Sequence, residues 1–198
     1  MAIIIDKVQK RKDIALSCRE LFIEYGISGL TISQLAKSAG VGKGTIYDYF
    51  KNKEDIVFEI VTLMMREHNI KKEKKLLNLP LAKEKIKYFF EFFYSQEDRE
   101  LRTIYKEFIS ISLVNPNEEI LDFQTACFDN YFAWFKNILQ DGIDKGEIVP
   151  EAIHFSKGFF ATAEGLFIAS VVTKTVTDVK KELDLYIDTL FKLIEVKK

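Results

Sequence analysis

A short stretch between residues 42 and 50 carries more small and hydrogen-bonding side chains than the buried face of a helix needs. Its spacing puts Ile46 and Phe50 on one helical face, so the other residues face outward. An outward ammonium can reach guanine O6 and N7, a glycine lets the backbone approach a base, and hydroxyls donate to phosphate oxygens. The stretch supplies each of these groups: Lys43, Gly44, Thr45, Tyr47 and Tyr49.

Residues 30–53 contain the elements that would position these groups. Thr31 with Gln34 forms a capping-box pattern, which predicts that a helix begins at Ile32. Gly40 is expected to end that helix, because glycine adopts the left-handed conformation at low cost. The stretch therefore predicts a helix-turn-helix, in which the N-terminal residues of the second helix meet base edges in the major groove of DNA.

The next helix is expected to begin at Lys53, because Asn52 and Asp55 form an N-cap pattern. Free backbone amides and the helix dipole favour an anion there, so we expect Lys53 to add a phosphate contact. The basic run of residues 10–12 has two interpretations. It contacts a neighbouring phosphate, or it is the solvated start of the first helix.

The residues of this region resemble the N-terminal signature of the TetR family of bacterial transcriptional regulators. The match covers about the first quarter of the chain: Ile14, Leu21, Phe22, Gly26, Thr31, Leu35, Ala36, Ala39, Gly40, Val41, Lys43, Gly44, Thr45, Ile46, Tyr47, Tyr49, Phe50, Lys53 and Glu54. The resemblance implies an all-α homodimer with N-terminal DNA-binding helices and a larger helical domain that binds a small effector.

By motif position, the resemblance also assigns roles to single residues. Phosphate contacts fall to Thr45, Tyr47, Tyr49 and Lys53. Positions near bases fall to Ser33, Gly42, Lys43 and Gly44, and Thr31 completes the expected DNA-binding set.

Four residues depart from the pattern of the family: Ser17 and Cys18 stand where alanines are usual, and Gly42 and Asp48 affect the face expected to meet DNA. Gly42 stands where a serine or another polar residue is common, which removes a possible cap or base contact. Asp48 puts a negative charge on the helix that would face DNA, where it accepts from a cytosine amine, pairs with Lys51, or points away. The base-reading code therefore stays open.

The charge of the chain is distributed unevenly. The net charge is −1 over 198 residues, but residues 1–53 hold nine basic and five acidic side chains, a net +4, which leaves −5 for residues 54–198. A positive head on an acidic body suits DNA binding at one end. We expect a DNA-binding domain over residues 1–53 and an effector-binding and dimerisation domain over residues 54–198.

The sequence contains no pattern typical of an enzyme. It has two histidines and lacks an HExxH motif, a glycine-rich phosphate loop and the Cys/His spacing of a metal site. We therefore expect no enzymatic activity, no cofactor and no bound metal. Cys18 and Cys127 fall in different expected helices, and each is expected to be a small core residue rather than a redox switch.

A cytoplasmic protein without a membrane segment is the expected class. Two unlinked cysteines fit a reducing compartment. Residues 2–5 are too short for a signal-peptide core, and the apolar run 158–172 contains Glu164 and is shorter than a membrane span.

The remainder of the chain is expected to be helical throughout. We expect helices over about residues 7–25 and 53–77, with further helices beginning near Pro80, Ser95, the Asn115–Pro116 pair and Pro150. The charged run 71–75 is interpreted as a solvated face of the long helix expected over residues 53–77.

The body is rich in aromatic residues, which indicates either a plain core or the lining of an effector cavity. The candidates for such a lining are Phe89, Phe93, Phe108, Phe128, Tyr131, Phe132, Trp134 and Phe159. If they form a cavity, its ligand is a small apolar or aromatic effector.

The last two expected helices carry complementary faces. One has a stripe of small residues, Gly158, Thr162, Gly165 and Ala169, and the other has an apolar seam, Leu183, Ile187, Leu190 and Ile194. Such faces pack within one subunit or across a two-fold axis, and the family resemblance favours a dimer interface.

Together these observations predict a ligand-responsive repressor that acts as a homodimer on a near-palindromic DNA operator. The alternative is a helical adaptor whose helix-turn-helix binds a protein partner. Only the DNA-binding alternative predicts a steep loss of affinity with increasing salt.

Overall fold

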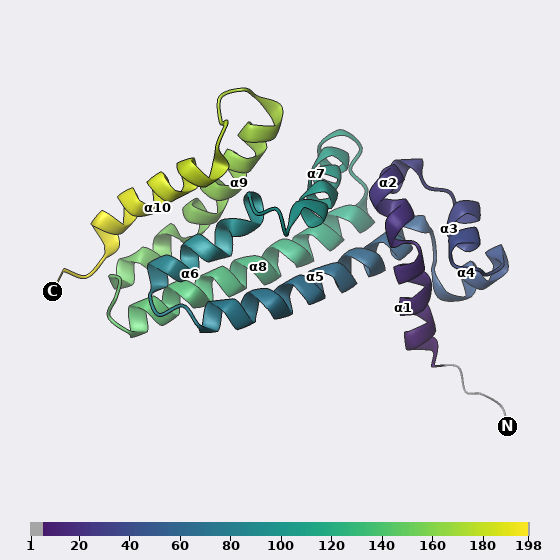
Figure 1. The fold of residues 1–198 in the computed structure, drawn as a ribbon, viewed down its shortest axis with the longest axis horizontal. Coiled ribbons are helices and arrows are strands. Elements are labelled where there is room, and N and C mark those ends of the chain that lie inside the picture. The colour runs from purple at the N-terminus through teal and green to yellow at the C-terminus, as the bar shows by residue number, and fades with distance from the viewer. Residues whose placement is uncertain (1–5, 198) are drawn as a thin grey trace. The chain divides into compact units, whose positions relative to one another are not determined.

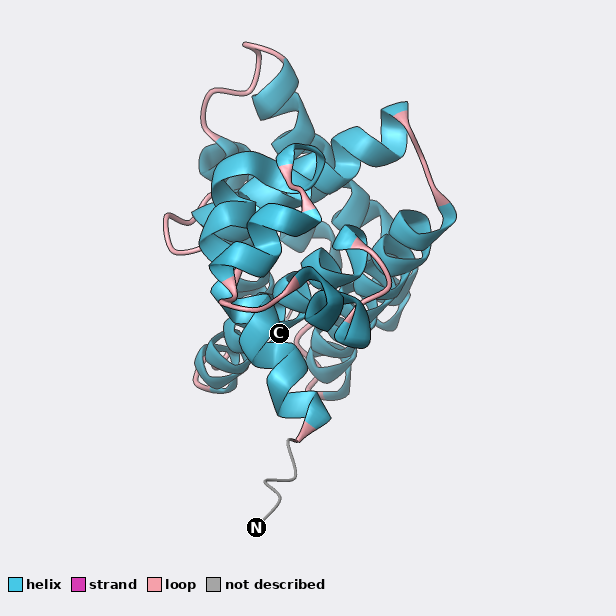
Figure 2. Ribbon diagram, turned by 90° about the vertical axis from the view of Figure 1, so that its right-hand side faces the viewer, coloured by secondary structure: helices cyan, strands magenta, loops and turns pink. Residues whose placement is uncertain are grey.

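The computed structural model describes residues 6–197, and within that range every regular element is a helix (Figures 1 and 2). The all-α prediction is therefore confirmed. Residues 2–5, which the sequence marks as too short for a signal-peptide core, lie outside the described residues. The α-helices are α1 (Lys7–Ser17), α2 (Arg19–Gly29), α3 (Ile32–Ser38), α4 (Lys43–Tyr49), α5 (Lys53–Leu77), α6 (Ala82–Phe89), α7 (Arg99–Val114), α8 (Glu118–Asp144), α9 (Ser156–Val172) and α10 (Val179–Ile194), with 3-10 helices η1 (Phe90–Phe93) and η2 (Pro150–Phe155).

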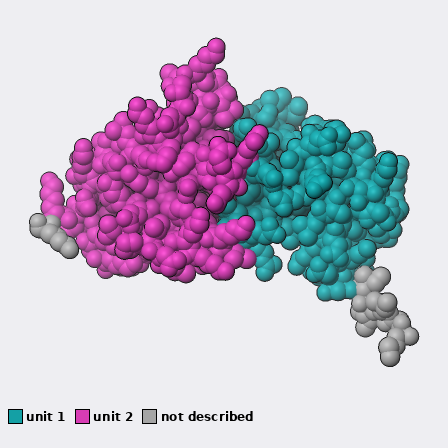
Figure 3. All heavy atoms as spheres, in the orientation of Figure 1, with its two compact units in different colours: residues 1–69, 100–123 teal, residues 70–99, 124–198 magenta. Residues whose placement is uncertain are grey.

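The chain divides into two compact units (Figure 3). Unit 1 comprises residues up to 69 together with 100–123, and unit 2 comprises residues 70–99 and 124–198. All three boundaries fall inside helices: α5 and α8 each contribute to both units, and the first residue of α7 belongs to unit 2. The expected division at residues 53 and 54 concerns binding roles rather than packing, and it stays a prediction.

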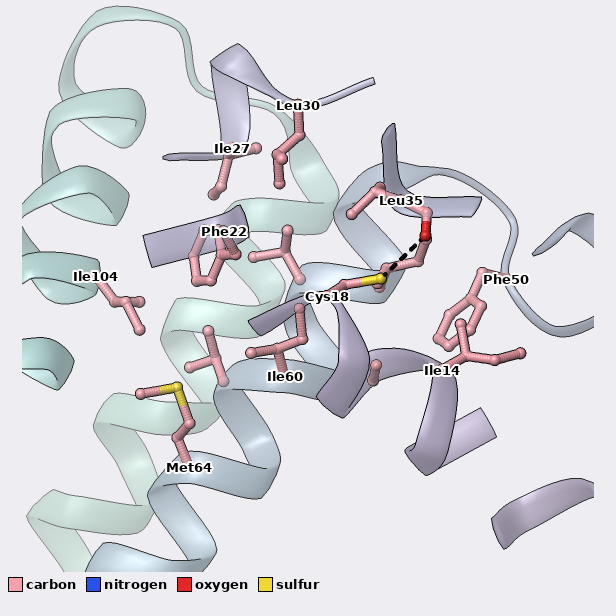
Figure 4. Packing of buried hydrophobic residues seen from close by; sticks show 14 of the residues in the cluster. Ile14, Cys18, Phe22, Ile27, Leu30, Leu35, Phe50, Ile60, Met64 and Ile104 are labelled. Carbon is pink, nitrogen blue, oxygen red and sulfur yellow. Dashed lines mark hydrogen bonds between the residues drawn. The ribbon is translucent and has the colours of Figure 1, made fainter. Parts of the chain in front are cut away.

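The core of unit 1 is an apolar cluster drawn from α1 to α5, α7 and the start of α8 (Figure 4). Phe22 is 1% exposed and Ile60 is fully buried. Cys18 is also fully buried, and its Sγ lies 3.5 Å from the carbonyl oxygen of Leu35. Burial raises the pKa of the Cys18 thiol to about 11, so this cysteine is a protonated core residue at neutral pH.

The expected helix over residues 7–25 is two helices. The break falls at Cys18, whose amide donates to the carbonyl of Ala15 at 3.0 Å and so tightens the end of α1. A second distortion lies at Gly26, which has φ 65° inside α2. There the Glu107 carboxylate of α7 accepts from the amide of Ile27 at 2.5 Å, and a Cβ at residue 26 would collide with it.

Other helix boundaries follow the sequence more closely. The long helix α5 has the expected bounds, and Gly146 ends the turn after α8 with φ 67°. α8 begins two residues later than the Asn115–Pro116 signal suggests, because Asn117 is the residue whose side chain accepts from the amide of Ile120 at 2.8 Å. Pro150 opens the 3-10 helix η2 rather than α9 itself.

Aromatic rings fill the interior of unit 2. Phe89 of α6 lies within 5.4 Å, between ring centroids, of both Phe90 and Phe135. Phe160 of α9 reaches the same cluster, at 6.1 Å from Phe90. Edge and tilted arrangements of this kind add to the stabilisation that burial provides.

Residues 150–172 are long and apolar enough to cross a membrane by length and composition, with a mean hydropathy of 1.3. The core helix of a folded protein passes the same test. In this stretch 28% of the apolar window is buried, including Phe159, Phe160 and Phe167, and a single helix of this kind is weak evidence of a membrane segment.

Ion pairs join α10 to α6 within unit 2. The Asp188 carboxylate lies 2.8 Å from the ammonium groups of both Lys83 and Lys87, and Lys87 also lies 3.3 Å from Asp184. Hydrogen bonds from Lys83 and Lys87 lower the pKa of Asp188 to about 2. Because the carboxylate keeps 43% exposure, solvent screens most of this attraction.

The Asp188 pairs should contribute to acid stability. A lowered pKa stabilises the fold above the ordinary value of 3.8, and that contribution is lost as the pH falls from about 4 to about 2. We expect Asp188→Asn to lower the free energy of unfolding at pH 7 by about 1 kcal/mol or less, and the difference to vanish near pH 2. Chemical denaturation at both pH values measures this, with Asp129→Asn, an exposed carboxylate of α8, as the control. An equal difference at both pH values would contradict it.

Candidate nucleic-acid interface

The turn between α3 and α4 forms as the sequence predicts. The amide of Gln34 donates to Oγ1 of Thr31 at 3.3 Å, and the amide of Thr31 donates to Oε1 of Gln34 at 2.9 Å, which completes the capping box. Gly40 has φ 63°, and the amide of Val41 donates back to the carbonyl of Ala36 at 3.0 Å. The helix-turn-helix geometry is therefore present in unit 1.

The inner faces of α3 and α4 are attached to the core by few residues. Leu35 and Ile46 are fully buried, and Ala36 is 4% exposed. Ile46 is the one buried residue of α4. Phe50, at the end of this helix, is 2% exposed. The exposed residues of α4 are therefore available to a partner.

The outer face of α4 presents the groups expected to contact DNA. Lys43, Gly44 and Tyr47 are exposed, Tyr47 to 59%, whereas Thr45 and Tyr49 are half-buried at the edges. A Cβ added at Gly44 would meet no atom within 4 Å. Internal packing thus gives no reason for a glycine at this position, which fits a close approach by a partner.

The other expected DNA-binding residues lie around this face. Ser33, Gly42 and Thr31 are exposed, and Gly42 caps α4 without a side-chain hydrogen bond. Asp48 is exposed as well.

Lys53 has a structural partner that the sequence did not indicate. It stands at the start of α5 as expected, but its ammonium donates to the carbonyl oxygens of Ile27 and Leu30, at 2.9 and 3.4 Å. An ammonium has three donors, so one N–H is left for a phosphate. Lys53 therefore fixes the end of α2 in addition to any contact with DNA.

Arg11 of α1 holds the C-terminal end of α4, a role that sequence reasoning missed. Its guanidinium lies 2.6 Å from Asp55 and 2.9 Å from Glu59, both on α5, and it donates to the carbonyl of Tyr49. Its Cζ also lies 4.2 Å from the centroid of the Phe50 ring. One side chain thus joins three helices of unit 1, and Arg11 is not a free phosphate contact.

The charges of this Arg11 cluster reinforce one another. Burial opposes the charged form of Arg11, but hydrogen bonds with Asp55 and Glu59 outweigh it and raise its pKa. Burial likewise opposes ionised Asp55, and the hydrogen bonds from Arg11 and the Lys51 amide outweigh it and lower its pKa. Both groups are charged across the physiological pH range. Arg11 is 44 positions from Asp55 and 48 positions from Glu59 in the sequence. No local sequence pattern could therefore have revealed these ion pairs.

Comparison with known proteins agrees with this geometry. The family model for bacterial regulatory proteins of the tetR family matches residues 17–60. The fatty acid metabolism regulator protein of Bacillus subtilis is 31% identical over 131 residues, which is 65% of this chain and 66% of that protein. The chain belongs to the TetR family.

Solved structures of the same family share the fold over nearly the whole chain. A TetR-family regulator from Cytophaga hutchinsonii has a TM-score of 0.78 at 17% identity, covering 99% of this chain and 100% of that one. The regulator FadR from Bacillus subtilis, solved in complex with stearoyl-CoA, has a TM-score of 0.66 at 25% identity, covering 90% and 96%. Members of the TetR family are DNA-binding transcriptional regulators, so α3 and α4 form the DNA-binding motif of this chain.

The candidate effector residues are divided between the two units. Phe108 packs in unit 1, 5.4 Å from Phe123 and 6.1 Å from Phe58. The other seven belong to unit 2, where Phe89, Phe93 and Phe159 are buried, Phe128 is 43% exposed, and the remaining three are half-buried: Tyr131, Phe132 and Trp134. Much of the predicted lining is therefore packed ring against ring.

The residues expected at the dimer interface divide into buried and exposed ones. Leu183, Ile187 and Ile194 are at most 2% exposed within one chain, so they pack inside their own subunit, and Leu190 is half-buried. On α9, Gly158 and Gly165 are exposed and a Cβ at either would meet nothing within 4 Å, while Thr162 and Ala169 are half-buried. The outer face of α10 instead carries Leu185, 61% exposed, and Leu193, 76% exposed.

Replacement of Arg11 should separate a positioning role from a phosphate contact. Arg11→Gln removes the charge-assisted hydrogen bonds, so we expect the free energy of unfolding to fall by about 1–3 kcal/mol. Operator affinity should fall as well, while the slope of log affinity against log salt concentration stays unchanged. A slope reduced by about one would instead show a direct phosphate contact. Lys7→Gln, an exposed basic residue of the same helix, controls for the lost charge.

Proposed function

We propose that the chain is a homodimeric, ligand-responsive repressor that acts on a near-palindromic operator. The observation that carries this proposal is the outer face of α4, where Lys43, Gly44 and Tyr47 stand exposed on a helix anchored by Ile46. Membership of the TetR family supports the proposal. Residues 1–53 then serve DNA binding and residues 54–198 serve effector binding and pairing, and the protein acts in the cytoplasm.

Pairing would place two α4 helices in successive major grooves, roughly 34–36 Å apart. The proposed interface uses the small-residue face of α9, with Gly158 and Gly165, and the exposed side chains Leu185 and Leu193 of α10. Small residues let a second helix approach closely, and exposed leucines gain from burial.

The effector would act on the helices shared by both units. α5 begins at the DNA-binding motif and ends in unit 2, so a displacement of its second half is carried to its first. A relative solved with stearoyl-CoA supports an effector with an apolar body, as does the aromatic interior of unit 2. By linkage, that effector must bind the DNA-free form more tightly than the DNA-bound form.

The first experiment is recovery of bound fragments from sheared DNA of the source organism, with Tyr47→Ala alongside. Enrichment of a few sites that share an inverted repeat, lost in the variant, would support the repressor. If neither protein enriches any site at low salt, the adaptor that binds a protein partner becomes the better reading.

Once an operator sequence is known, two variants of α4 should have different effects, one on sequence preference and the other on overall affinity. Lys43→Ala removes a base contact, so we expect preference among site variants to relax by about 1–3 kcal/mol at one position. Tyr47→Phe removes a phosphate contact and should weaken binding to all sequences alike, by about 1 kcal/mol. Titrations against a panel of single-base variants measure both. Unchanged affinity and preference with Lys43→Ala would remove Lys43 from the base-reading residues.

The pairing surface is tested by Leu193→Asp. A carboxylate on this face should be costly to bury, so we expect the variant to sediment as a monomer while keeping its helical content. Leu77→Asp is the matched control, since Leu77 is 78% exposed, against 76% for Leu193, and lies at the end of α5. If the Leu193 variant stays dimeric at micromolar concentration, this face of α10 is not the interface.

A further inference from the structure

Lys72 departs from the charged run to which it belongs. The sequence suggests that residues 71–75 form a solvated face of α5, and four of the five are exposed. Lys72 alone is buried, at 4% exposure. A lysine is almost never buried to this degree unless a partner compensates its charge.

The surroundings of Lys72 supply no such partner. Its ammonium lies 5.4 Å from the ring centroid of Tyr88 and 5.4 Å from that of Phe89. Among residues 6–197 it forms neither an ion pair nor a hydrogen bond. Asp98 and Glu91 act on it only from beyond ion-pair distance, and burial lowers the pKa of Lys72 to about 8 because these carboxylates offset little of the desolvation.

A lysine at 4% exposure whose ammonium forms no ion pair among the described residues is expensive to keep. Attraction to two aromatic faces returns part of the desolvation cost, but a methionine or leucine would fill the same space without that cost. Stability therefore does not account for a lysine here. The charge points to a compensating group that is not part of the chain.

The position of Lys72 indicates what that group belongs to. Phe89, one of the two rings beneath the ammonium, lies 5.6 Å from Trp134 and 6.5 Å from Tyr131 between ring centroids. All of these residues are in unit 2. The ammonium thus lies at the edge of the aromatic surface proposed to hold the effector.

We propose that Lys72 pairs with the carboxylate of an effector whose apolar body lies against the aromatic residues of unit 2. The effector class is then an organic monocarboxylate. One ammonium compensates one negative charge, and the nearby carboxylates of Asp98 and Glu91 oppose a second. This assignment rests on the proposed function in that unit 2 is taken as the effector domain.

Direct binding can be followed without DNA. Trp134 is the single tryptophan of the chain and lies against Phe89, so its fluorescence reports on this site. The probes are decanoate, decanol and decyltrimethylammonium, which share one chain length and differ in head-group charge. We expect decanoate to bind about tenfold more tightly than decanol, or better, and the cation to bind most weakly. Equal affinity for decanoate and decanol would overturn the proposal without any variant.

Two variants then locate the effect. Lys72→Met should cost decanoate about tenfold in affinity and leave decanol unchanged, whereas Lys74→Met, an exposed neighbour in the same run, should bind as the unmodified protein does. Without ligand, Lys72→Met should also unfold at a higher temperature, because a largely desolvated charge without an ion pair is removed. A lowered melting temperature with unchanged decanoate binding would assign Lys72 a structural role and overturn the proposal.

Decanoyl-CoA distinguishes the carboxylate from a phosphate. It carries phosphates and no free carboxylate, so we expect its binding to be insensitive to Lys72→Met. If it binds more tightly than decanoate and loses affinity in the variant, Lys72 pairs with a phosphate and the monocarboxylate assignment fails.

Operator binding separates this inference from the proposed function. Lys72→Met should bind the operator as tightly as the unmodified protein without ligand, and decanoate should no longer release it. If the unmodified protein binds decanoate through Lys72 but binds no operator, the repressor proposal fails and the Lys72 assignment stands. If the unmodified protein binds the operator but does not bind decanoate, the Lys72 assignment fails and the repressor proposal stands.

Discussion

The DNA-binding motif depends on the attachment of two helices that are too short to be stable alone. α3 and α4 each have seven residues, and isolated helices of that length are not formed in water. Their geometry comes from the buried side chains Leu35, Ile46 and Phe50 and from Arg11, which ties the end of α4 to α1 and α5. The exposed face of α4 can carry small and polar side chains because the contacts that hold the helix are made by a few buried residues.

Local signals in the sequence were sufficient for this part of the fold. The capping box at Thr31 and the left-handed glycine at Gly40 involve neighbours a few residues apart, so the pattern alone placed α3 and α4. The Arg11 cluster and the Glu107 contact to Ile27 join residues 38 to 80 positions apart. Such partners are set by the tertiary arrangement, and a single sequence does not reveal them.

The candidate binding residues of the body were predicted less well, for a related reason. Helical periodicity shows that side chains share a face, but it does not show what the face meets. Leu183 and Ile187 form a seam as expected, yet the seam is buried in its own chain. Lys72 shows the reverse case, since a run of charges predicts solvent and one member is inside. The burial of Lys72 could be found only by combining the periodicity of α5 with the position of α6, whose Tyr88 and Phe89 lie beside the ammonium.

The single buried residue of α4 has a consequence for the evolution of such regulators. Because α4 is held by Ile46, by Tyr49 and Phe50 at its end and by Arg11, substitutions at its exposed positions have little effect on folding. Surface substitutions away from packing contacts typically change stability by about 0.5 kcal/mol or less. Operator preference can therefore drift, or be re-engineered by exchanging the outward residues, while the scaffold and its effector response are retained. In this fold, preference for a DNA sequence and stability are determined by different residues and can change independently.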